Sequence, residues 1–504
     1  MKSEVLLVCS IVLLCGISCK PRPLAFAQTG EVLSKIHCAS CHAYPEPSLL
    51  DKTSWERYVL PRMGQMLGVL PLETGAGSFI EPEAKDLAFQ NPLVFRKESP
   101  LSAAEWEAIR DFYVQNAPAS RVMPLPVLDM ELNQFEVVFP NYFLSPPSVT
   151  MVKMADGRLY VGDANSKRLY EFDMALRLQK SALVGEGAIG YHRLPHGEVV
   201  GTMGSFSPTD LPAGQLLFFP SARGELPKVL IDSLKRPVHI EVADLDGDGR
   251  LDFVVSEFAK WTGSLCWWQN EGTGHFTRHL LRDMPGAIRT AVHDFDADGL
   301  PDIVALFGQG DEGIFIYYNR GNGHFDEQRV LRFPASYGSS HFALFDYDGD
   351  PHPDIVYTCG DNADFPSVYK PYHGIRIFQN NGRNQFKEVF FYPMPGAYGA
   401  IPHDFDMDGD LDIAAISFFP DFQTAPAQAF VFLENNGNND FRAHTFPAVN
   451  KGRWLVMDAG DLDGDGDWDI VLGALTMQTI PETGLVAQWV RDGIPFVLLR
   501  NKAR

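Results

Sequence analysis

The sequence predicts a mainly β fold, a seven-bladed β-propeller preceded by a small all-α domain. Three observations predict it. A nine-residue loop with aspartates at positions 1, 3, 5 and 9 occurs five times, each time directly before an apolar run that suits a strand. Two upstream stretches of similar length have strand character without this loop, and residues 28–120 show no strand alternation. A repeat of about 50 residues with strand signals is typical of a propeller.

The five loops place carboxylates in the same order. They begin at Asp244, Asp294, Asp346, Asp404 and Asp461, so that successive loops start 50, 52, 58 and 57 residues apart. Several carboxylate oxygens around one point are what Ca²⁺ prefers, and a glycine at position 6 permits a sharp turn. The sequence therefore predicts structural calcium sites with these ligands: Asp244, Asp246, Asp248, Asp252, Asp294, Asp296, Asp298, Asp302, Asp346, Asp348, Asp350, Asp354, Asp404, Asp406, Asp408, Asp412, Asp461, Asp463, Asp465 and Asp469.

Turn formation alone is the simpler explanation of these loops, because Asp and Gly favour hairpin turns. It does not account for carboxylates at four fixed positions in five copies. The loops also lack the glutamate at position 12 that an EF-hand would have. One loop departs from the pattern, since Pro351 stands where the others have glycine. Proline cannot adopt a positive φ, so we expect the Asp346 loop to bind calcium weakly or with another geometry.

A second landmark accompanies the loops. It is an apolar strand ending in asparagine, followed by a glycine-containing turn and a phenylalanine, and the last copy stops at Asn501. Loop and landmark together resemble the FG-GAP/VCBS repeat family over residues 237–504, and the resemblance implies a calcium-binding β-propeller. Two divergent blades, expected around residues 157–172 and 197–219, raise the total to seven, within the range of propellers. We assign the propeller to residues 136–504. The landmark copies are Asn270 with Phe276, Asn319 with Phe325, Asn380 with Phe386, and Asn435 with Phe441.

Residues 28–120 are predicted to form a small helical domain. Helical spacing places Val32, Leu33 and Ile36 on one side of a first helix. The pattern Thr53–Glu56 suits a capping box, with Pro61 stopping or kinking the helix that follows. A second capping box, Ser102–Glu105, opens a helix through Asn116 with one apolar face made by Trp106, Ile109 and Tyr113.

Cys38-Ala-Ser-Cys41-His42 follows the first helix. Cys-x-x-Cys-His is the attachment motif of haem c, in which the two thiols bond the porphyrin and the imidazole is the proximal iron ligand. A redox dithiol or half of a zinc site are the alternatives. Neither is favoured, because no second cysteine pair lies nearby and no βαβ pattern surrounds the motif.

The helices at the two ends of this segment resemble the paired terminal helices of class I cytochromes c. The resemblance implies a methionine between motif and last helix as sixth iron ligand. We expect Met63, which lies just past the proline where the chain is predicted to leave the helix, with Met66 as the second candidate. Core packing is the ordinary role of such methionines. Residues 75–100 have no counterpart in a minimal cytochrome and suit an inserted loop.

The chain is expected to be exported. Residues 1–19 combine Lys2 with an apolar run, as in a signal peptide. Gly16-Ile-Ser-Cys19 is similar to a bacterial lipobox, so that Cys19 would carry lipid and anchor the protein on the periplasmic or cell-surface side of a membrane; cleavage after Ala25-Phe-Ala27 is the alternative. Residues 121–135 suit a proline-containing connector. Cys266 and Cys359 could form a disulfide, but two separate buried thiols are favoured.

The net charge of −22 comes with no basic stripe, which argues against nucleic-acid binding. No motif identifies a catalytic residue. Positions before the loops carry histidine and arginine, which could bind an anion or a metal if they line the central channel. Three functions stay open: electron transfer to a redox partner or from a small-molecule donor, with the propeller as docking scaffold; a propeller oxidoreductase that reduces its own haem; and an adhesion or glycan-binding propeller. The channel candidates are His239, Arg289, His293, His341, His403 and Arg453.

Overall fold

The structure, a computed structural model, describes residues 29–72, 94–120, 124–222, 225–272, 274–363, 370–437, 440–476 and 484–503. The predicted signal peptide with Cys19 and most of the predicted inserted loop lie outside the described residues. Within the described part, none of the helices is both long and apolar enough to traverse a bilayer.

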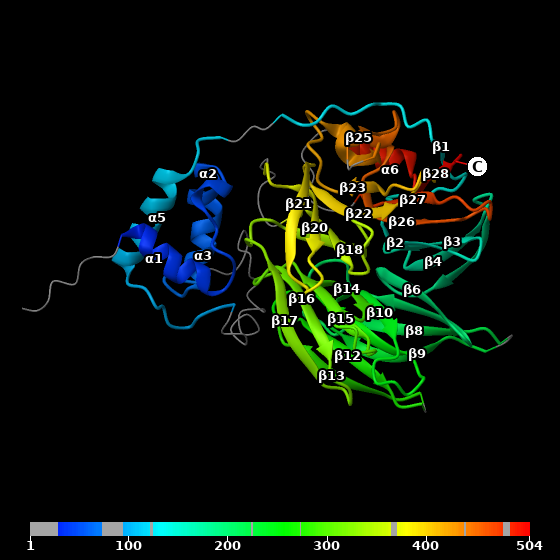
Figure 1. The fold of residues 1–504 in the computed structure, drawn as a ribbon, viewed down its shortest axis with the longest axis horizontal. Coiled ribbons are helices and arrows are strands. Elements are labelled where there is room, and N and C mark those ends of the chain that lie inside the picture. The colour runs from blue at the N-terminus through cyan, green and yellow to red at the C-terminus, as the bar shows by residue number, and fades with distance from the viewer. Residues whose placement is uncertain are drawn as a thin grey trace, which may run out of the picture.

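The prediction of a seven-bladed propeller is confirmed. Seven four-stranded antiparallel sheets follow one another round a central axis (Figure 1). Blade 1 contains β2 (Val149–Ala155), β3 (Arg158–Asp163), β4 (Arg168–Asp173) and β5 (Leu178–Leu183). Blade 2 contains β6 (Ala188–Leu194), β7 (Gly197–Thr202), β8 (Gly214–Pro220) and β9 (Lys228–Leu234). Both expected divergent blades are therefore present.

The next four blades contain the aspartate loops that begin at residues 244, 294, 346 and 404. Blade 3 contains β10 (Pro237–Ala243), β11 (Asp252–Glu257), β12 (Ser264–Asn270) and β13 (Phe276–Arg282). Blade 4 contains β14 (Ala287–His293), β15 (Asp302–Phe307), β16 (Gly313–Asn319) and β17 (Phe325–Arg332). Blade 5 contains β18 (Ser339–Phe345), β19 (Asp354–Cys359), β20 (Gly374–Asn380) and β21 (Phe386–Pro393). Blade 6 contains β22 (Ala397–His403), β23 (Asp412–Ser417), β24 (Phe430–Asn435) and β25 (Phe441–His444).

Blade 7 joins the two ends of the propeller. Its strands β26 (Trp454–Gly460), β27 (Asp469–Ala474) and β28 (Phe496–Asn501) come from the C-terminal part, and its outer strand is β1 (Phe135–Val138). β1 pairs antiparallel with β28, with Phe135 opposite Asn501. The copy that looked truncated in the sequence is thus completed from the other side of the repeat array. β1 begins one residue before the range assigned to the propeller.

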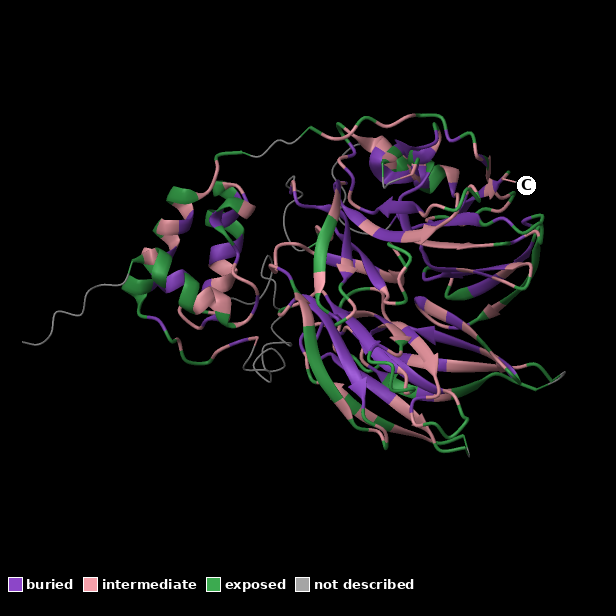
Figure 2. Cartoon of the chain, viewed as in Figure 1, coloured by how far each residue is buried: buried purple, intermediate pink, exposed green. Residues whose placement is uncertain are grey.

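Each aspartate loop connects the innermost strand of its blade to the second strand. Every residue of these second strands, β11, β15, β19, β23 and β27, is buried. A strand covered on both faces needs apolar residues without alternation, which explains the continuous apolar runs after the loops. The outer strands are largely exposed, as Figure 2 shows along β17 and β21.

The helical domain contains α1 (Gly30–His37), α2 (Lys52–Ser54), a π-helical turn (Trp55–Val59), α3 (Leu60–Met66) and α5 (Ala103–Asn116). The capping box at Ser102 is confirmed, and Trp106, Ile109 and Tyr113 are buried as predicted. Two local predictions are wrong, and one alternative of a third is excluded. The helix that contains Trp55 begins after Asp51, whose side chain accepts from Ser54 N, instead of at Thr53. Pro61 does not stop the helix, since a π turn precedes it and α3 continues to Met66. Val32 and Ile36 are exposed, leaving Leu33 as the buried apolar residue of α1.

The helical domain contacts the propeller beside blades 3 to 5 (Figure 1). Ala43 forms a parallel bridge with Pro334 in the β17–β18 connection. The ring of Phe95 lies 5.2 Å from that of Trp261 in the β11–β12 connection. Both connections lie at the end of the propeller where the inner strands begin, opposite the aspartate loops. The helical domain therefore packs on the loop-free end.

Candidate functional site

The five aspartate loops each bring three carboxylates together. One oxygen of each lies within 4.8 Å of the others. The groups are Asp244, Asp246 and Asp248; Asp294, Asp296 and Asp302; Asp346, Asp348 and Asp354; Asp404, Asp406 and Asp408; and Asp461, Asp463 and Asp465. The other predicted ligands, Asp252, Asp298, Asp350, Asp412 and Asp469, lie in the same loops outside these groups. Oxygen ligands at this density suit a hard divalent cation.

The first aspartate of each loop also organises the backbone. In four loops its Oδ2 accepts the N–H of the glycine at position 6, at 2.9–3.1 Å. Those glycines, Gly249, Gly299, Gly409 and Gly466, have φ between 84° and 99°, as the predicted sharp turn requires. In the remaining loop Pro351 has no N–H to donate. Asp346 keeps the contact with the N–H of Gly349 at position 4, which the Asp244 and Asp461 loops also have. The departure seen in the sequence thus removes one hydrogen bond of the turn.

The aspartate at position 9 has a role that sequence reasoning missed. In blade 6 the Oδ2 of Asp412 accepts from Phe405 N at 3.1 Å and its Oδ1 accepts from Asn435 N at 2.8 Å. Asp252, Asp302, Asp354 and Asp469 accept the two equivalent N–H groups in their own blades. The position-9 carboxylate therefore ties the loop to the landmark asparagine. The sequence did contain a signal for this contact, because the same asparagine follows every aspartate loop.

Two landmark asparagines also connect neighbouring blades. Asn319 of blade 4 donates to Leu245 O in the blade 3 loop at 2.8 Å, and Asn501 of blade 7 donates to Phe405 O in the blade 6 loop at 2.7 Å. Residue 2 of the loop is buried in both cases. The loops are consequently part of the packing between blades.

Burial and crowding disfavour the ionised form of the position-9 carboxylates. Burial, with the neighbouring aspartates adding to it, raises the pKa of Asp252 to about 6, of Asp412 to about 7 and of Asp469 to about 6. Buried carboxylates beside like charges behave in this way. A divalent cation would offset the repulsion and keep the groups ionised.

The Cys-x-x-Cys-His residues lie on one turn after α1. Cys38 begins a 3₁₀ turn (Cys38–Ser40), and both thiols are free. The ring of His42 is 9% exposed, and its Nδ1 lies 2.8 Å from Ala43 O. A carbonyl only accepts, so Nδ1 carries the proton and Nε2 keeps its lone pair for a metal. Burial raises the pKa of Cys38 to about 11, which does not suit a reactive dithiol.

Met63 and Met66 face different surroundings. Met63 packs against the core of the helical domain together with Cys38. Met66 packs against Phe95 and Trp261 at the contact with the propeller. Both residues lie inside α3, so the reason given for Met63, a chain leaving the helix after Pro61, does not hold. Its shared cluster with Cys38 is a separate reason to keep it as first candidate.

Three arginines surround one carboxylate next to the motif. Asp311 is contacted by Arg282 at 3.2 Å, Arg329 at 2.9 Å and Arg332 at 3.2 Å. Burial lowers the pKa of His42, with Arg332 adding to the shift and Asp311 opposing it. Arg282 also pairs with Glu327, so the arginine group, Arg282, Arg329 and Arg332, together with these two carboxylates carries a formal charge of +1 where blades 3 and 4 meet beside the helical domain.

The six channel candidates separate into three sets. His239, Arg289 and His341 occupy equivalent positions on the inner strands of blades 3, 4 and 5, directly after a register shift in each strand. His293 and His403 lie at the loop end of their strands, where His403 stacks on Trp468 at 3.7 Å. Arg453 is buried before β26, donates to Phe418 O and lies over its ring. Only the first set is on the axis.

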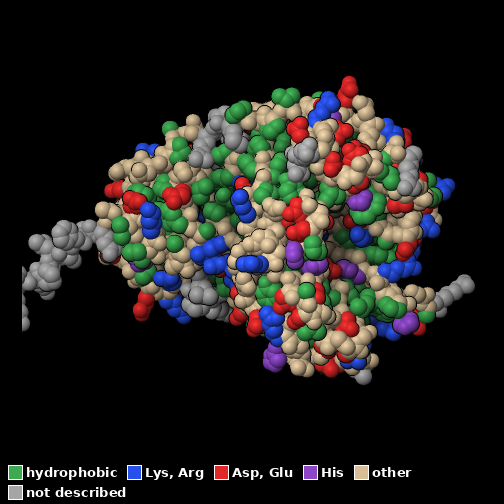
Figure 3. Space-filling view, viewed as in Figure 1, with side chains coloured by type: hydrophobic (Ala, Val, Ile, Leu, Met, Phe, Trp, Pro, Cys, Tyr) green, Lys and Arg blue, Asp and Glu red, His purple; other side chains and the backbone are tan. Residues whose placement is uncertain are grey.

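Further axial residues were missed by the sequence analysis. They are Lys153, His192, Glu241 and Asp458, two residues beyond the equivalent position in blades 1, 2, 3 and 7. Lys153 Nζ lies 3.1 Å from Asp458 Oδ1. The bulge near the start of each inner strand decides which side chains point into the channel. The sequence of one repeat does not show where that bulge lies, so these residues were missed. Figure 3 shows histidines gathered near the middle of the propeller, over the region of β10 and β14.

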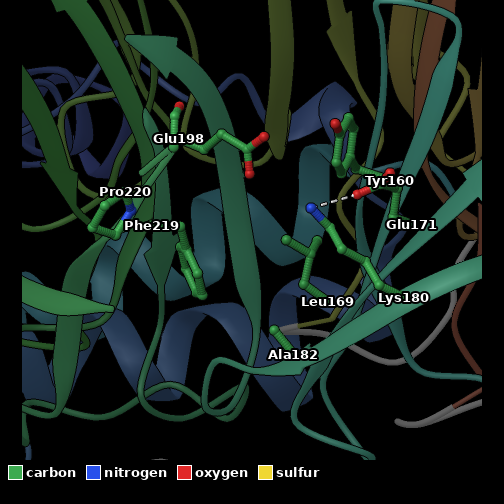
Figure 4. A pocket seen from close by; sticks show the side chains of 9 residues that line it. Tyr160, Leu169, Glu171, Lys180, Ala182, Glu198, Phe219 and Pro220 are labelled. Carbon is green, nitrogen blue, oxygen red and sulfur yellow. Dashed lines mark ion pairs between the residues drawn. The ribbon is translucent and has the colours of Figure 1, made fainter. Parts of the chain in front are cut away.

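A separate cavity of about 300 Å³ lies between blades 1 and 2 (Figure 4). Glu171 and Lys180 form an ion pair of 2.8 Å on one wall, beside Tyr160, while Glu198 and Phe219 come from the other. None of the predicted site residues lines it.

Comparison with known proteins supports the repeat assignment. A family model described as FG-GAP-like repeat matches residues 244–305 and again residues 294–357. The chain contains FG-GAP-like repeats. These two matches span the first three aspartate loops, and the equivalent strands and loops of blades 6 and 7 extend the pattern. The FG-GAP-like repeats and the seven blades agree with the predicted propeller.

Solved structures with overall similarity share little sequence with this chain. BBS1N, in a crystal structure of its complex with ARL6DN soaked with lead, is 10% identical with a TM-score of 0.44, and the match covers 75% of this chain and 99% of that one. The N-terminal domain of Nup159 is 8% identical with a TM-score of 0.44, covering 76% and 99%. Sqt1 of Saccharomyces cerevisiae is 8% identical with a TM-score of 0.42, covering 72% and 97%. At this level the matches carry no inference about function.

Proposed function

We propose that this is an exported electron-transfer protein that carries haem c in its helical domain and uses a calcium-binding propeller as a docking scaffold. The observation that carries the proposal is the placement of Cys38, Cys41 and His42 on one turn with the Nε2 of His42 free to bind iron. A bound haem would supply one-electron exchange between Fe(II) and Fe(III). Export, with the lipid anchor at Cys19, fits covalent haem attachment outside the cytoplasm.

The residues of the helical domain fit the group. Cys38 and Cys41 would hold the porphyrin covalently, and Nδ1–H of His42 donates to Ala43 O, which fixes the orientation of the ring. Met63 would be the sixth ligand, because it shares the core cluster with Cys38. Burial of His42 keeps the imidazole neutral, as a metal ligand must be.

The propeller supports docking beside the motif. Ala43 bridges to Pro334, and the arginine group lies next to His42. A positive surface near a redox centre favours an acidic partner and increases its association rate at low salt. A redox protein with an acidic face, or an anionic small-molecule donor, is the expected partner.

Calcium in the five loops would hold the scaffold together. The support is the grouping of three carboxylates in each loop and the raised pKa of the position-9 aspartates. Four loops contain the positive-φ glycine, so we propose that these bind tightly and that the Asp346 loop binds more weakly.

Covalent haem is the first test. Mass spectrometry of the protein matured in a bacterial host that attaches haem c should show one added haem, and the Cys38→Ala, Cys41→Ala double variant should show none. The matched control is Cys266→Ala, a buried thiol on β12 of the propeller, which should keep the haem. An unmodified wild-type chain would remove the proposed redox function.

The axial ligand has its own test. Met63→Leu should remove the sulfur-ligand absorption band of the oxidised protein and lower the reduction potential, whereas Met66→Leu should leave both unchanged. The opposite result would assign the ligand to Met66. A band that survives both substitutions would exclude methionine ligation by α3.

An oxidoreductase that passes electrons from a small molecule to its own haem is the second candidate. One observation favours it: the helical domain packs on the end of the propeller where the axial residues His239, Arg289 and His341 lie. Haem reduction by a substrate added to the purified protein would favour this function over simple electron transfer.

A further inference from the structure

The axial channel holds two charged groups without an ion-pair partner. Among the described residues Arg289 takes part in no hydrogen bond or direct ion pair, although it is half-buried in the centre of the propeller, where the carboxylates of Glu241 and Asp458 act on it only at longer range. Glu241, on the neighbouring inner strand, accepts a hydrogen bond from the adjacent Val242 N and forms no ion pair with any residue that the structure describes. By contrast, Lys153 and Asp458 in the same channel are paired at 3.1 Å. Arg289 and Glu241 therefore attract each other at longer range while their hydrogen-bonding atoms stay available to a third group.

The histidines beside Arg289 offer further donors. The backbone N–H of Thr290 donates to His239 Nδ1 at 3.3 Å, so the proton of the neutral ring is on Nε2. The buried Nδ1 of His341 has no hydrogen-bond partner within the described part of the chain. Burial and the charge of Arg289 lower the pKa of both rings, which keeps them neutral. Next to them Gly399 of blade 6 has no side chain at the equivalent position, which leaves room in the channel.

The approach to this region is also basic. Arg236, before β10, and Arg453, before β26, are both buried and donate to loop carbonyls, Phe206 O and Phe418 O. Phe206 of blade 2 packs with Phe418 and Tyr398 of blade 6, so an aromatic cluster crosses this end of the channel. The carboxylate of Asp361 acts on both guanidinium groups and offsets part of their positive charge beneath this apolar cover.

We propose that the channel binds a small carboxylate that also bears a hydroxyl or amino group. The carboxylate would accept from the Arg289 fork and from His239 Nε2–H, and the hydroxyl or amino group would donate to Glu241. Arg289 and Glu241 lie on adjacent strands without contacting each other, as two recognition points on one small molecule require. A planar carboxylate is what a guanidinium fork matches. This proposal does not depend on the haem, because it concerns binding only.

Isothermal titration calorimetry on the full chain tests this proposal with three carboxylates of similar size: glycolate, glycine and acetate. Wild-type protein should bind glycolate or glycine about tenfold more tightly than acetate, since a hydrogen bond to a charged group contributes that much. Arg289→Gln should weaken all three by tenfold or more, and Arg289→Lys should give intermediate affinity because it keeps the charge and loses the fork. Glu241→Gln should remove the preference over acetate.

Arg168→Gln is the matched control, because Arg168 is exposed on β4 and far from the axis, and it should bind all probes as wild type does. Circular dichroism melts establish that each variant is folded. Equal affinity for glycolate, glycine and acetate would overturn the assigned pairing with Glu241. Absence of binding, or binding that survives Arg289→Gln, would overturn the proposal itself.

Discussion

Blades 1 and 2 differ from blades 3 to 7 in how the innermost hairpin is closed. In blade 1 two residues, Asp156 and Gly157, connect β2 to β3, both with positive φ. Their backbone angles match the tight turn that strand twist favours. In blade 2, Pro195 and His196 connect β6 to β7. In blades 3 to 7 the same connection is the aspartate loop, in which carboxylates replace the short turn.

The difference shows that an ion is not required to make a blade. Blades 1 and 2 have the same four-strand order as the others without any aspartate loop. The loops instead add contacts between blades, such as Asn319 with Leu245. We infer that calcium, where bound, stabilises the propeller round blades 3 to 7, and that blades 1 and 2 are the part of the ring that does not depend on it.

Removing calcium should therefore have the largest effect. A chelator is expected to lower the melting temperature by more than 10 °C, since a ligand present at about 1,000 times its Kd contributes about 4 kcal/mol per site. Differential scanning calorimetry of the full chain with and without chelator measures this. Hydrogen exchange should increase in blades 3 to 7 and change little in blades 1 and 2. An unchanged melt would contradict calcium binding, and uniform exchange would contradict the division between blades.

A single aspartate should distinguish the two kinds of hairpin. The two carboxylate oxygens of Asp412 accept hydrogen bonds from Phe405 N and Asn435 N, and Asp412→Asn replaces one of these oxygens with an NH₂ group. We therefore expect a loss of about 2 kcal/mol in the free energy of unfolding. The matched control is Asp156→Asn in blade 1, an exposed partner of Arg193. A surface ion pair contributes about 0–1 kcal/mol, and asparagine tolerates the positive φ. Urea titration measures both, and equal losses would contradict the comparison.

The repeat could be predicted because its signals are local. The loop, the apolar second strand and the landmark asparagine lie within one repeat, so blades 3 to 7 follow from the sequence, and strand character alone indicates blades 1 and 2. β1 could not be predicted in the same way, because its pairing partner Asn501 is at the other end of the chain. Glu241 and Asp458 were missed for a related reason: a bulge in each inner strand decides which residues reach the axis.

Protons should compete with calcium in the loops. In the calcium-free fold the pKa of Asp412 is about 7, and burial is the main cause. A raised carboxyl pKa means that the calcium-free folded state is protonated at pH 5.5 and must lose the proton to bind the ion. The increase in melting temperature caused by calcium should therefore be smaller at pH 5.5 than at 7.5. Buried histidines such as His239 change the stability of the calcium-free and the calcium-bound protein by the same amount. Their titration therefore does not affect the increase in melting temperature caused by calcium. A calcium effect that grows on acidification would be inconsistent with these carboxylates as ligands.

The smallest expected effect comes from the loop that departs from the others. Pro351→Gly should allow the positive φ seen at Gly409 and restore an N–H that can donate to Asp346. We expect calcium affinity at this loop to increase by about tenfold, the value of roughly one hydrogen bond, with little change in the melt at saturating calcium. Native mass spectrometry at limiting calcium counts the occupied sites.

The reciprocal variant, Gly409→Pro, should convert the blade 6 loop into a weak one, because it removes both the positive φ and the donor to Asp404. If Gly409→Pro binds as tightly as wild type, the turn at position 6 does not control affinity. The Asp346 loop would then be expected to bind calcium as tightly as the other four loops. Pro351 would change only the backbone shape of its loop.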